Sequence, residues 1–355
     1  MKPWNCPVEG IEQRVGNMAQ VAGIRRFRFC EGKADGVEAA EVHTGSGLEL
    51  TVLPGRGMDI AWVSYKGVPL NYLSKTGIVS PMYYDCHDMN WLRTFFAGAV
   101  TTCGLTNTGN PEPFEDRVLG QQMLSLHGRI SNTAAEQVGV YEDWENGEYV
   151  MRVSGKVQEA ILHGEHLSLR RTISTALGKK EFVLHDRIRN HAQYPQPLQV
   201  MYHINFGYPL LDACTRMALN SQEVVERTGT AAEEPDGWDR CEEPRAGHLE
   251  GGYIHRMGVG ADGLVHACIV NGALELGVEI VYSLEELPFM NEWKVMNAKE
   301  YVVAFEPGNA LPIGRKAMGE RVQVLQPNEE KTITLTYRVL DGQQEIGEAL
   351  LRVNG

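Results

Sequence analysis

The sequence lacks the cysteine pattern of a disulfide-rich protein or of a cysteine-based zinc site. Its seven cysteines are an odd number, and no two of them form a CxxC pair. Disulfide frameworks use paired cysteines, and cysteine zinc sites use closely spaced ones. We therefore expect reduced thiols, as in the cytosol.

The chain also lacks long apolar runs and clusters of positive charge. No apolar run approaches the roughly 18 residues of a membrane-spanning helix, and Met1–Asn5 has no apolar signal-peptide core. The net charge is −13, and the densest basic segment, Arg25–Arg28, has the pattern of one strand's polar face. These absences argue against membrane insertion and nucleic-acid binding, and they predict a soluble cytoplasmic protein.

Helical periodicity is sparse, whereas alternation of apolar and polar residues is frequent. The best helix candidate is residues 86–97, where apolar side chains recur at helical spacing. Alternation that predicts strands occurs at residues 47–52, 149–157, 167–173, 182–188, 274–282 and 332–339. Turn signals separate them at residues 146–147, 177–180 and 327–330. Many short strands predict a sandwich or barrel.

The 355 residues are interpreted as a single all-β domain spanning residues 1–355, because such domains often run long. The most loop-like segment is residues 228–250, which is rich in Gly, Pro, Ala and acidic residues. Long loops in compact domains are often functional.

Three short signatures each place one titratable side chain among apolar or small residues. They are Leu126–Arg129 (LHGR), Met201–Gly207 (MYHINFG) and Val303–Asn309 (VAFEPGN). Opening a sugar ring needs an acid for the ring oxygen and a base for the anomeric hydroxyl. Histidine titrates near neutral pH, and a glutamate between Phe and Pro should have a raised pKa through desolvation. His127, His203 and Glu306 are therefore the candidate catalytic residues.

Other residues are candidates for sugar binding. Trp293 can stack on the apolar face of a pyranose, and Arg129 lies two residues after His127, where it could donate to sugar hydroxyls. Arg56 and Asp59 could pair with each other or line the cleft. The segment His163–His166 resembles a metal motif, but its place between two strand patterns favours a solvated hairpin turn.

With two further passages, the signatures resemble the galactose mutarotase-like (aldose 1-epimerase) superfamily, in its bacterial, uncharacterised aldose epimerase-like branch. The passages are Leu53–Ile60 (LPGRGMDI) and Val100–Asn107 (VTTCGLTN). The likeness covers roughly residues 10–340. The order and spacing of the three signatures is much more specific than Leu-His-Gly alone.

The resemblance implies a large antiparallel β-supersandwich with few short helices and a sugar cleft on its concave face. It also implies that His203 is the general acid, that Glu306 is the general base and that His127 binds near the ring oxygen. The implied activity is cofactor-free interconversion of the anomers of a free monosaccharide. The family's usual Asn-Arg motif is absent, so Asn107 is expected to take its place in substrate binding. Asp239 is the best candidate for the family's sugar-binding aspartate.

Two other functions remain open on the sequence. One is a non-catalytic carbohydrate-binding protein on the same fold, since fold alone does not fix function. The other is a sugar isomerase that holds a divalent metal through His127, His203 and Glu306. A glycosidase is disfavoured because such enzymes generally use two carboxylates. The sequence leaves homodimerisation and the identity of the sugar open.

Overall fold

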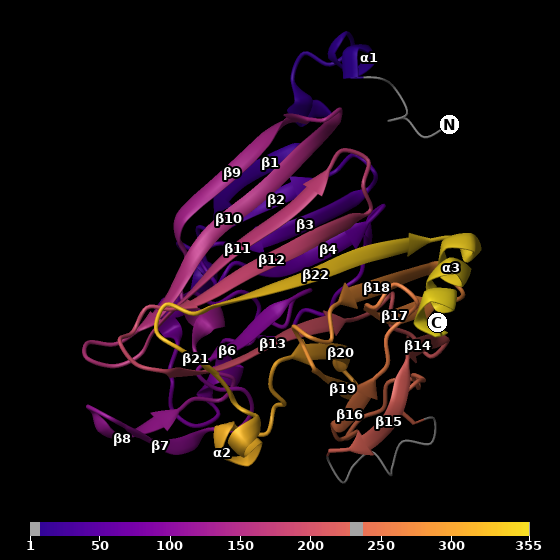
Figure 1. The fold of residues 1–355 in the computed structure, drawn as a ribbon. Helices are drawn as coiled ribbons and strands as arrows, with labels where there is room; N and C mark the ends of the chain where they lie inside the picture. The colour runs from indigo at the N-terminus through magenta and orange to yellow at the C-terminus, as the bar shows by residue number, and fades with distance from the viewer. Residues whose placement is uncertain (1–7, 228–236, 355) are drawn as a thin grey trace.

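The computed structural model describes residues 8–227 and 237–354, which form layered antiparallel sheets with a few short helices (Figure 1). The eight-stranded sheet comprises, in spatial order, β14 (Thr215–Leu219), β17 (Val265–Asn271), β18 (Leu276–Tyr282), β22 (Glu330–Asp341), β12 (Glu181–Asn190), β11 (His166–Ala176), β10 (Glu148–Ala160) and β9 (Glu136–Glu145). A five-stranded sheet comprises β1 (Gly23–Arg28), β2 (Glu38–His43), β3 (Leu48–Leu53), β4 (Asp59–Tyr65) and β5 (Val68–Pro69).

The sheet that carries the candidate site has seven strands. They are β15 (Ser221–Glu226), β16 (Gly251–Met257), β19 (Phe289–Asn297), β20 (Glu300–Gly308), β13 (Gln196–Phe206) and β21 (Gln323–Leu325), with β6 (Thr101–Leu105) paired to β13. A small hairpin is formed by β7 (Glu112–Asp116) and β8 (Gly120–Leu124). The α-helices are α1 (Val8–Glu12), α2 (Arg315–Met318) and α3 (Gln343–Asn354). The predicted all-β antiparallel architecture is confirmed.

The strands that alternation predicts are all present, as β3, β10, β11, β12, β18 and β22. The Asn146–Gly147 turn joins β9 to β10, and both residues have positive φ values, 49° and 85°. Residues 161–165, between β10 and β11, form the expected hairpin turn. Of the expected loop at residues 228–250, residues 228–236 lie outside the described part of the chain.

The helix predicted for residues 86–97 is wrong. Only Asn90–Arg93 is helical, as one 3₁₀ turn that buries Trp91. Asp88 and Ala97 flank this turn with φ values of 48° and 63°. A right-handed helix ends where residues adopt left-handed conformations, as they do here on both sides. The helical spacing of apolar residues in this segment therefore corresponds to one turn and not to a longer helix.

Strand β13 has two buried faces, which is unusual for a strand in an antiparallel sheet. Leu198, Val200, Tyr202, Ile204 and Phe206 belong to the main core, which includes residues from all three large sheets. The alternate residues of β13, Met201 and His203 among them, face the opposite side. There Met201 packs with side chains that include Trp91 and Phe95. Period-2 alternation thus points each successive β13 side chain into a different buried environment.

A buried ion cluster joins the three large sheets behind β13. Arg171 on β11 donates to Asp186 on β12 through Nε (2.8 Å) and Nη2 (2.7 Å). Its Nη1 lies 3.3 Å from Asp59 on β4, and the hydroxyl of Tyr202 on β13 donates to Asp186 at 2.7 Å. All three charged side chains are fully buried. Asp59 also accepts hydrogen bonds from the backbone and hydroxyl of Thr102.

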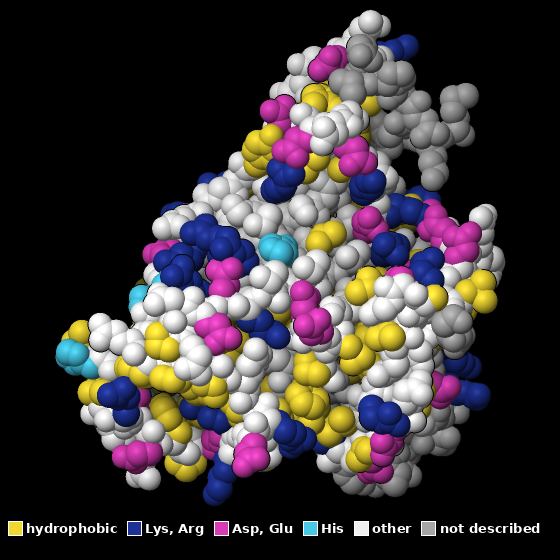
Figure 2. All heavy atoms as spheres, viewed as in Figure 1, with side chains coloured by type: hydrophobic (Ala, Val, Ile, Leu, Met, Phe, Trp, Pro, Cys, Tyr) yellow, Lys and Arg dark blue, Asp and Glu magenta, His cyan; other side chains and the backbone are white. Residues whose placement is uncertain are grey.

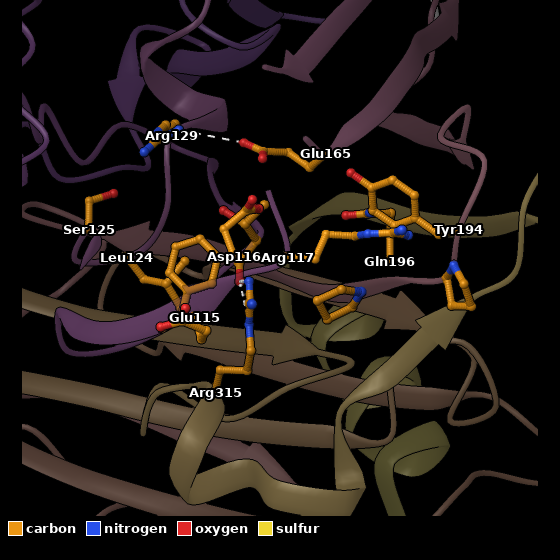
Figure 3. Close-up of a pocket in the computed structure, with 14 residues that line it drawn as sticks. Glu115, Asp116, Arg117, Leu124, Ser125, Arg129, Glu165, Tyr194, Gln196 and Arg315 are labelled. Atoms are coloured by element: carbon orange, nitrogen blue, oxygen red, sulfur yellow. Dashed lines mark hydrogen bonds and ion pairs between the residues drawn. The ribbon is translucent and has the colours of Figure 1, made fainter. Parts of the chain in front are cut away.

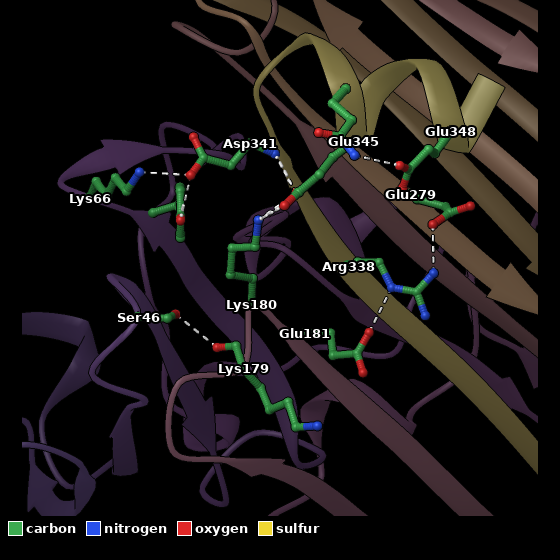
Figure 4. Close-up of polar contacts among 12 residues, drawn as sticks. Ser46, Lys66, Lys179, Lys180, Glu181, Glu279, Arg338, Asp341, Glu345 and Glu348 are labelled. Carbon is green, nitrogen blue, oxygen red and sulfur yellow. Dashed lines mark hydrogen bonds and ion pairs between the residues drawn. The ribbon is translucent and has the colours of Figure 1, made fainter. Parts of the chain in front are cut away.

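The C-terminal helix α3 packs across the end of the eight-stranded sheet (Figure 1). Ion pairs surround its contact, as Figure 4 shows: Lys180 pairs with Glu345 of the helix, and Arg338 donates to the buried Glu279 at 2.7 Å. Arg352 of the helix also pairs with Glu279, at 2.8 Å. The two ion pairs that the helix itself makes join it to the residue before β12 and to β18.

The surface is charged and mixed in sign. The face shown in Figure 2 carries Lys, Arg, Asp and Glu side chains close to one another, and many form cross-strand pairs such as Arg187 with Glu330 at 2.9 Å. None of the described helices is both long and apolar enough to span a membrane.

We predict that Arg171→Met lowers the free energy of unfolding by about 3–5 kcal/mol, because it leaves Asp59 and Asp186 buried without their cation. The matched control is Arg187→Gln on the sheet surface, where the side chain is 52% exposed and the expected loss is about 0–1 kcal/mol. Urea unfolding of the two variants measures the difference. Equal losses would show that the buried cluster is not a major source of stability.

Candidate active site

The three signature residues converge on one cavity. His203 lies on β13 and Glu306 on the neighbouring strand β20, where Ile204 is paired with Phe305. His203 Nε2 is 3.0 Å from Glu306 Oε1, and the two side chains are only 6% and 3% exposed. The ring of His127 lies 6.3 Å from that of His203, nearly perpendicular to it. The structure therefore brings together residues separated by up to 179 positions in the sequence.

His127 is held in a turn whose next residue, Gly128, must be glycine because its backbone lies against that of Gly104. His127 and Gly128 have φ values of 53° and 71°. A Cβ on Gly128 would lie 2.1 Å from the carbonyl oxygen of Gly104. Gly104 in turn accepts a hydrogen bond from Arg129 N and donates one to His127 O. This contact explains why the Leu-His-Gly and Thr-Thr-Cys-Gly segments occur together.

The cavity has a volume of about 150 Å³ and mixed apolar and polar walls. It is lined by Met89, Trp91, Leu92, Phe95, Gly109, Asn110, Leu126, His127, His203, Arg227, Glu250, Trp293, Glu306 and Pro312. The ring of Phe95 lies 5.1 Å from that of His203, and Trp91 lies 4.8 Å from His127. These aromatic rings remove water from the imidazoles.

Burial shifts the pKa values of the histidine and the carboxyl in opposite directions. It lowers the pKa of His203 to about 3, an effect to which the nearby His127 adds. It raises the pKa of Glu306 to about 8, although the positive charge of Arg227 opposes this. A low-dielectric site disfavours each charged form. Burial thus favours a protonated Glu306 carboxyl and a neutral His203 ring, and their facing atoms lie 3.0 Å apart, where they can exchange a proton.

The imidazole of His127 is neutral, and its surroundings determine which of its two nitrogens carries the proton. Its Nδ1 accepts a hydrogen bond from Gly109 N at 3.3 Å, which assigns the proton to Nε2. Burial, together with the charge of Arg227, lowers the pKa of His127 to about 3. His127 can therefore offer one N–H to a neutral ligand in the cavity.

Trp293 lines the cavity, as its position in the sequence suggested. The carboxylate of Glu250 holds its indole in place through a hydrogen bond. The indole ring lies 5.4 Å from that of His203, and its Nε1 donates to Glu250 at 2.9 Å. The polar edge of the indole is thus occupied, and its apolar face is available to stack on a ring.

Three residues of the site were missed by sequence reasoning. Asn291, which is paired with Glu306 across β19 and β20, donates from Nδ2 to Glu306 Oε2 at 2.7 Å. Arg227 and Glu250 both line the cavity. A signal for these two was present, because Arg227 directly precedes the predicted loop at residues 228–250 and Glu250 is its last residue.

Four residues that the sequence suggested for substrate binding lie outside the cavity. Buried Asn107 donates from Nδ2 to carbonyls of the surrounding turn, among them Ser125 O at 2.9 Å. Arg129 lines a neighbouring cavity. Arg56, 1% exposed, donates to the carbonyl oxygens of Ser131 and Thr94. Asp239 is partly buried, and its carbonyl accepts from Met217 N.

Arg56 and Asp59 neither pair with each other nor line the cavity, which were the two alternatives that the sequence left open, and each has a separate structural role. Asp59 pairs with Arg171, as described above, and Arg56 is bound by backbone carbonyls. Asn107 and Arg56 thus shape the walls behind the site instead of facing a ligand.

The site does not have the geometry of a metal centre. Among the described residues, one group of three His, Cys, Asp or Glu side chains has its ligand atoms within 4.8 Å of one another, namely Asp85, Cys86 and His87. His127, His203 and Glu306 do not form such a group. Because Nδ1 of His127 is engaged by Gly109 and Nε2 of His203 by Glu306, the trio is arranged for hydrogen bonding.

We predict that the wild-type protein loses more stability between pH 5 and pH 8 than the Glu306→Gln variant. The carboxyl has a pKa of about 8 when folded and about 4.3 when unfolded. Between these values only the unfolded chain releases the proton, so the free energy of unfolding falls as pH rises. Urea unfolding at both pH values measures this.

The control for this pH experiment is Glu330→Gln, which removes an exposed, paired carboxylate. It should keep the wild-type fall between pH 5 and pH 8. An identical pH dependence in wild type and Glu306→Gln would mean that Glu306 titrates at an ordinary pKa.

Comparison with known proteins identifies the family. A family model described as "Domain of unknown function (DUF4432)" matches residues 34–339. No curated protein matches the chain.

Several solved structures share the fold. A protein of Klebsiella pneumoniae subsp. pneumoniae MGH 78578, described as a "putative aldose 1-epimerase", has a TM-score of 0.88 at 24% identity, with 97% of this chain and 94% of that chain covered. A galactose mutarotase-like protein of Clostridium acetobutylicum has a TM-score of 0.64 at 13% identity, covering 91% and 99%.

The galactose 1-epimerase of Lactobacillus acidophilus NCFM has a TM-score of 0.57 at 12% identity, covering 91% of this chain and 100% of that chain. At such identities the likeness establishes the fold alone. Because the family model matches most of its length, this chain belongs to the DUF4432 family, and it has the fold of these galactose mutarotase-like and "putative aldose 1-epimerase" structures.

Proposed function

We propose that the protein is a cofactor-free mutarotase that interconverts the anomers of a free monosaccharide. The observation that carries the proposal is the buried His203–Glu306 pair, with 3.0 Å between proton-exchanging atoms inside a cavity lined by aromatic rings. The ring oxygen and the anomeric hydroxyl of a sugar are attached to the same carbon. Two proton-exchanging atoms this close together can therefore reach both oxygens.

The chemistry follows from moving protons within this pair. Transfer of the shared proton from Glu306 to His203 gives a carboxylate and an imidazolium. In that form Glu306 takes the proton of the anomeric hydroxyl while His203 protonates the ring oxygen, and the C1–O5 bond breaks to give the open-chain carbonyl. Rotation about C1–C2 presents the other carbonyl face, and reclosure with the two roles exchanged gives the second anomer.

Other residues position the sugar and the carboxyl. His127 donates from Nε2, and Trp293 supplies an apolar face for the sugar ring. Asn291 holds one carboxyl oxygen of Glu306 at 2.7 Å, which leaves the other oxygen for proton exchange. Arg227 favours the ionised carboxylate, since its charge lowers the pKa of Glu306.

The proposal includes a cytoplasmic location and a free monosaccharide as the ligand. The six described cysteines are free thiols, which is consistent with a reducing compartment. The acidic net charge of −13 gives no attraction for nucleic acid.

We predict that Glu306→Gln and His203→Asn each lower the rate of anomer exchange about 10²–10⁴-fold, which is the usual contribution of one acid or base. Polarimetry and NMR exchange across a panel of freshly dissolved aldoses and ketoses measure the rate. His185→Asn on β12 is the matched control, and it should retain the wild-type rate.

If the wild-type protein accelerates no sugar above the buffer rate, the mutarotase proposal fails for that panel. Binding without acceleration would then favour a non-catalytic carbohydrate-binding protein. Loss of exchange after treatment with a chelator would instead favour a metal-dependent isomerase.

We also predict that Asn291→Ala lowers the exchange rate roughly tenfold, about 1.4 kcal/mol of barrier, with little change in KM. The variant frees the carboxyl of Glu306 and removes a donor that lowers its pKa. The alkaline limb of the pH–rate profile, where the pair loses the proton of Glu306, should therefore move to higher pH. Asn297→Ala, at the end of the same strand, is the control, and a profile that does not move would contradict the positioning role.

A further inference from the structure

A second cavity lies on the other side of the turn that carries His127. Its volume is about 280 Å³, compared with about 150 Å³ for the acid–base cavity. Ser125 and Arg129 line the second cavity, whereas Leu126 and His127 line the first. One five-residue turn therefore forms part of both walls.

Six charged side chains converge on the second cavity from separate segments of the chain (Figure 3). Three are arginines, Arg117, Arg129 and Arg315, and three are acids, Glu115, Asp116 and Glu165. Their formal charges cancel. Among these six side chains, Arg129 and Glu165 form the one ion pair within 4.0 Å, and at 3.7 Å it is longer than a hydrogen bond. Donors and acceptors are thus held apart around the space.

Aromatic rings and backbone groups fix several of these side chains. The guanidinium carbon of Arg117 lies 4.3 Å from the ring centroid of Tyr194, and that of Arg315 lies 5.3 Å from the ring centroid of Phe114. Arg315 also donates from Nε to the carbonyl oxygen of Thr106 at 3.1 Å. Cation–π contacts restrain a guanidinium and leave its N–H edge available, although Nε and Nη2 of Arg315 are both engaged by Thr106 O. The wall is therefore preorganised for a polar ligand.

The balance of charges selects the class of ligand. A multiply charged anion would meet three carboxylates, and a cation would meet three guanidinium groups. A neutral ligand with many hydroxyl groups can donate to the acids and accept from the arginines at closely spaced points. We propose that this cavity is a second carbohydrate-binding site that takes a neutral, polyhydroxylated sugar unit.

A sugar bound there would touch the support of His127. Tyr84 donates from its hydroxyl to Ser125 Oγ at 2.9 Å, and Asn107 donates to Ser125 O. Contacts with Ser125 or Arg129 would therefore act on the turn that sets the position of His127. Binding at this site does not require the His203–Glu306 pair, so it stands or falls separately from the mutarotase activity.

The test uses two readouts that separate the cavities. Trp91 and Trp293 line the acid–base cavity, whereas none of the tryptophans in the described part of the chain lines the second one. Calorimetric titration of the full chain with D-galactose, D-glucose and D-fructose at millimolar concentrations reports both sites. Tryptophan fluorescence in the same titrations reports the acid–base cavity. Inorganic phosphate serves as the anionic probe.

We expect at least one sugar to give a calorimetric binding event without a matching change in tryptophan fluorescence. Arg117→Gln and Glu165→Gln should each weaken that event at least tenfold. The exposed position of Arg117 and the isosteric change at Glu165 should leave folding intact, which urea unfolding checks. Arg187→Gln, which removes an arginine far from the cavity on β12, should bind as the wild type does.

Three results would overturn the proposal. The first is the absence of any sugar binding beyond the event that tryptophan fluorescence reports. The second is unchanged binding in both Arg117→Gln and Glu165→Gln. The third is tighter binding of phosphate than of every sugar, which would make the cavity an anion site.

Discussion

The buried cluster around Arg171 is the interaction on which the arrangement of the sheets depends. A guanidinium at zero exposure, paired with Asp186 and Asp59, connects β11, β12 and β4. Tyr202 adds β13 to the cluster through its hydroxyl. Because a buried charge is costly unless it is paired and hydrogen-bonded, these strands must meet in one relative position. The next residue along β13 is His203, which faces the opposite side, so the cluster and the site share one strand.

Burial of ionisable side chains has the opposite outcome at the candidate site. Behind β13, the burial of Arg171 is offset by its pairing with Asp186 and Asp59, and Arg171 remains a cation. In the cavity, His203 and Glu306 face each other among aromatic rings, and burial favours the neutral form of both. A neutral pair that shares one proton can give and accept protons in either direction. Such symmetry suits the reaction that we propose, which must run in both directions between two anomers.

The turn at residues 125–129 connects the site with its surroundings. The contact of Gly104 with Gly128 sets its backbone, and hydrogen bonds from Asn107 and Tyr84 hold it from behind. His127 projects from one side of this turn and Arg129 lines the cavity on the other. A residue conformation that is costly on its own, the positive φ of His127, persists because the packing around it is so closely determined.

The amino-acid sequence alone was enough to predict the all-β architecture and to single out three residues that the structure brings to one cavity. Alternation over residues such as 149–157 and 182–188 is a local property of the chain, and it specifies strands wherever one face is buried. His127, His203 and Glu306 were also recognisable, because a titratable side chain among apolar residues is rare without a purpose. The single 3₁₀ turn at residues 90–93 shows the limit of local reading, since its flanks adopt left-handed conformations.

Which polar residues share a cavity became clear from the three-dimensional packing. Arg129 is two residues from His127, yet the turn sends it to a different cavity, whereas Asn291 meets Glu306 through a strand pairing that spacing does not reveal. Asp59 forms its ion pair with Arg171, which lies 112 positions away in the sequence, and not with Arg56, which lies three positions away. Alternation of apolar and polar residues predicts which side chains lie on the same face of a strand. Strand register, turn geometry and the stacking of the sheets determine which of these faces lie against each other. Those depend on contacts between distant segments, which no local pattern encodes.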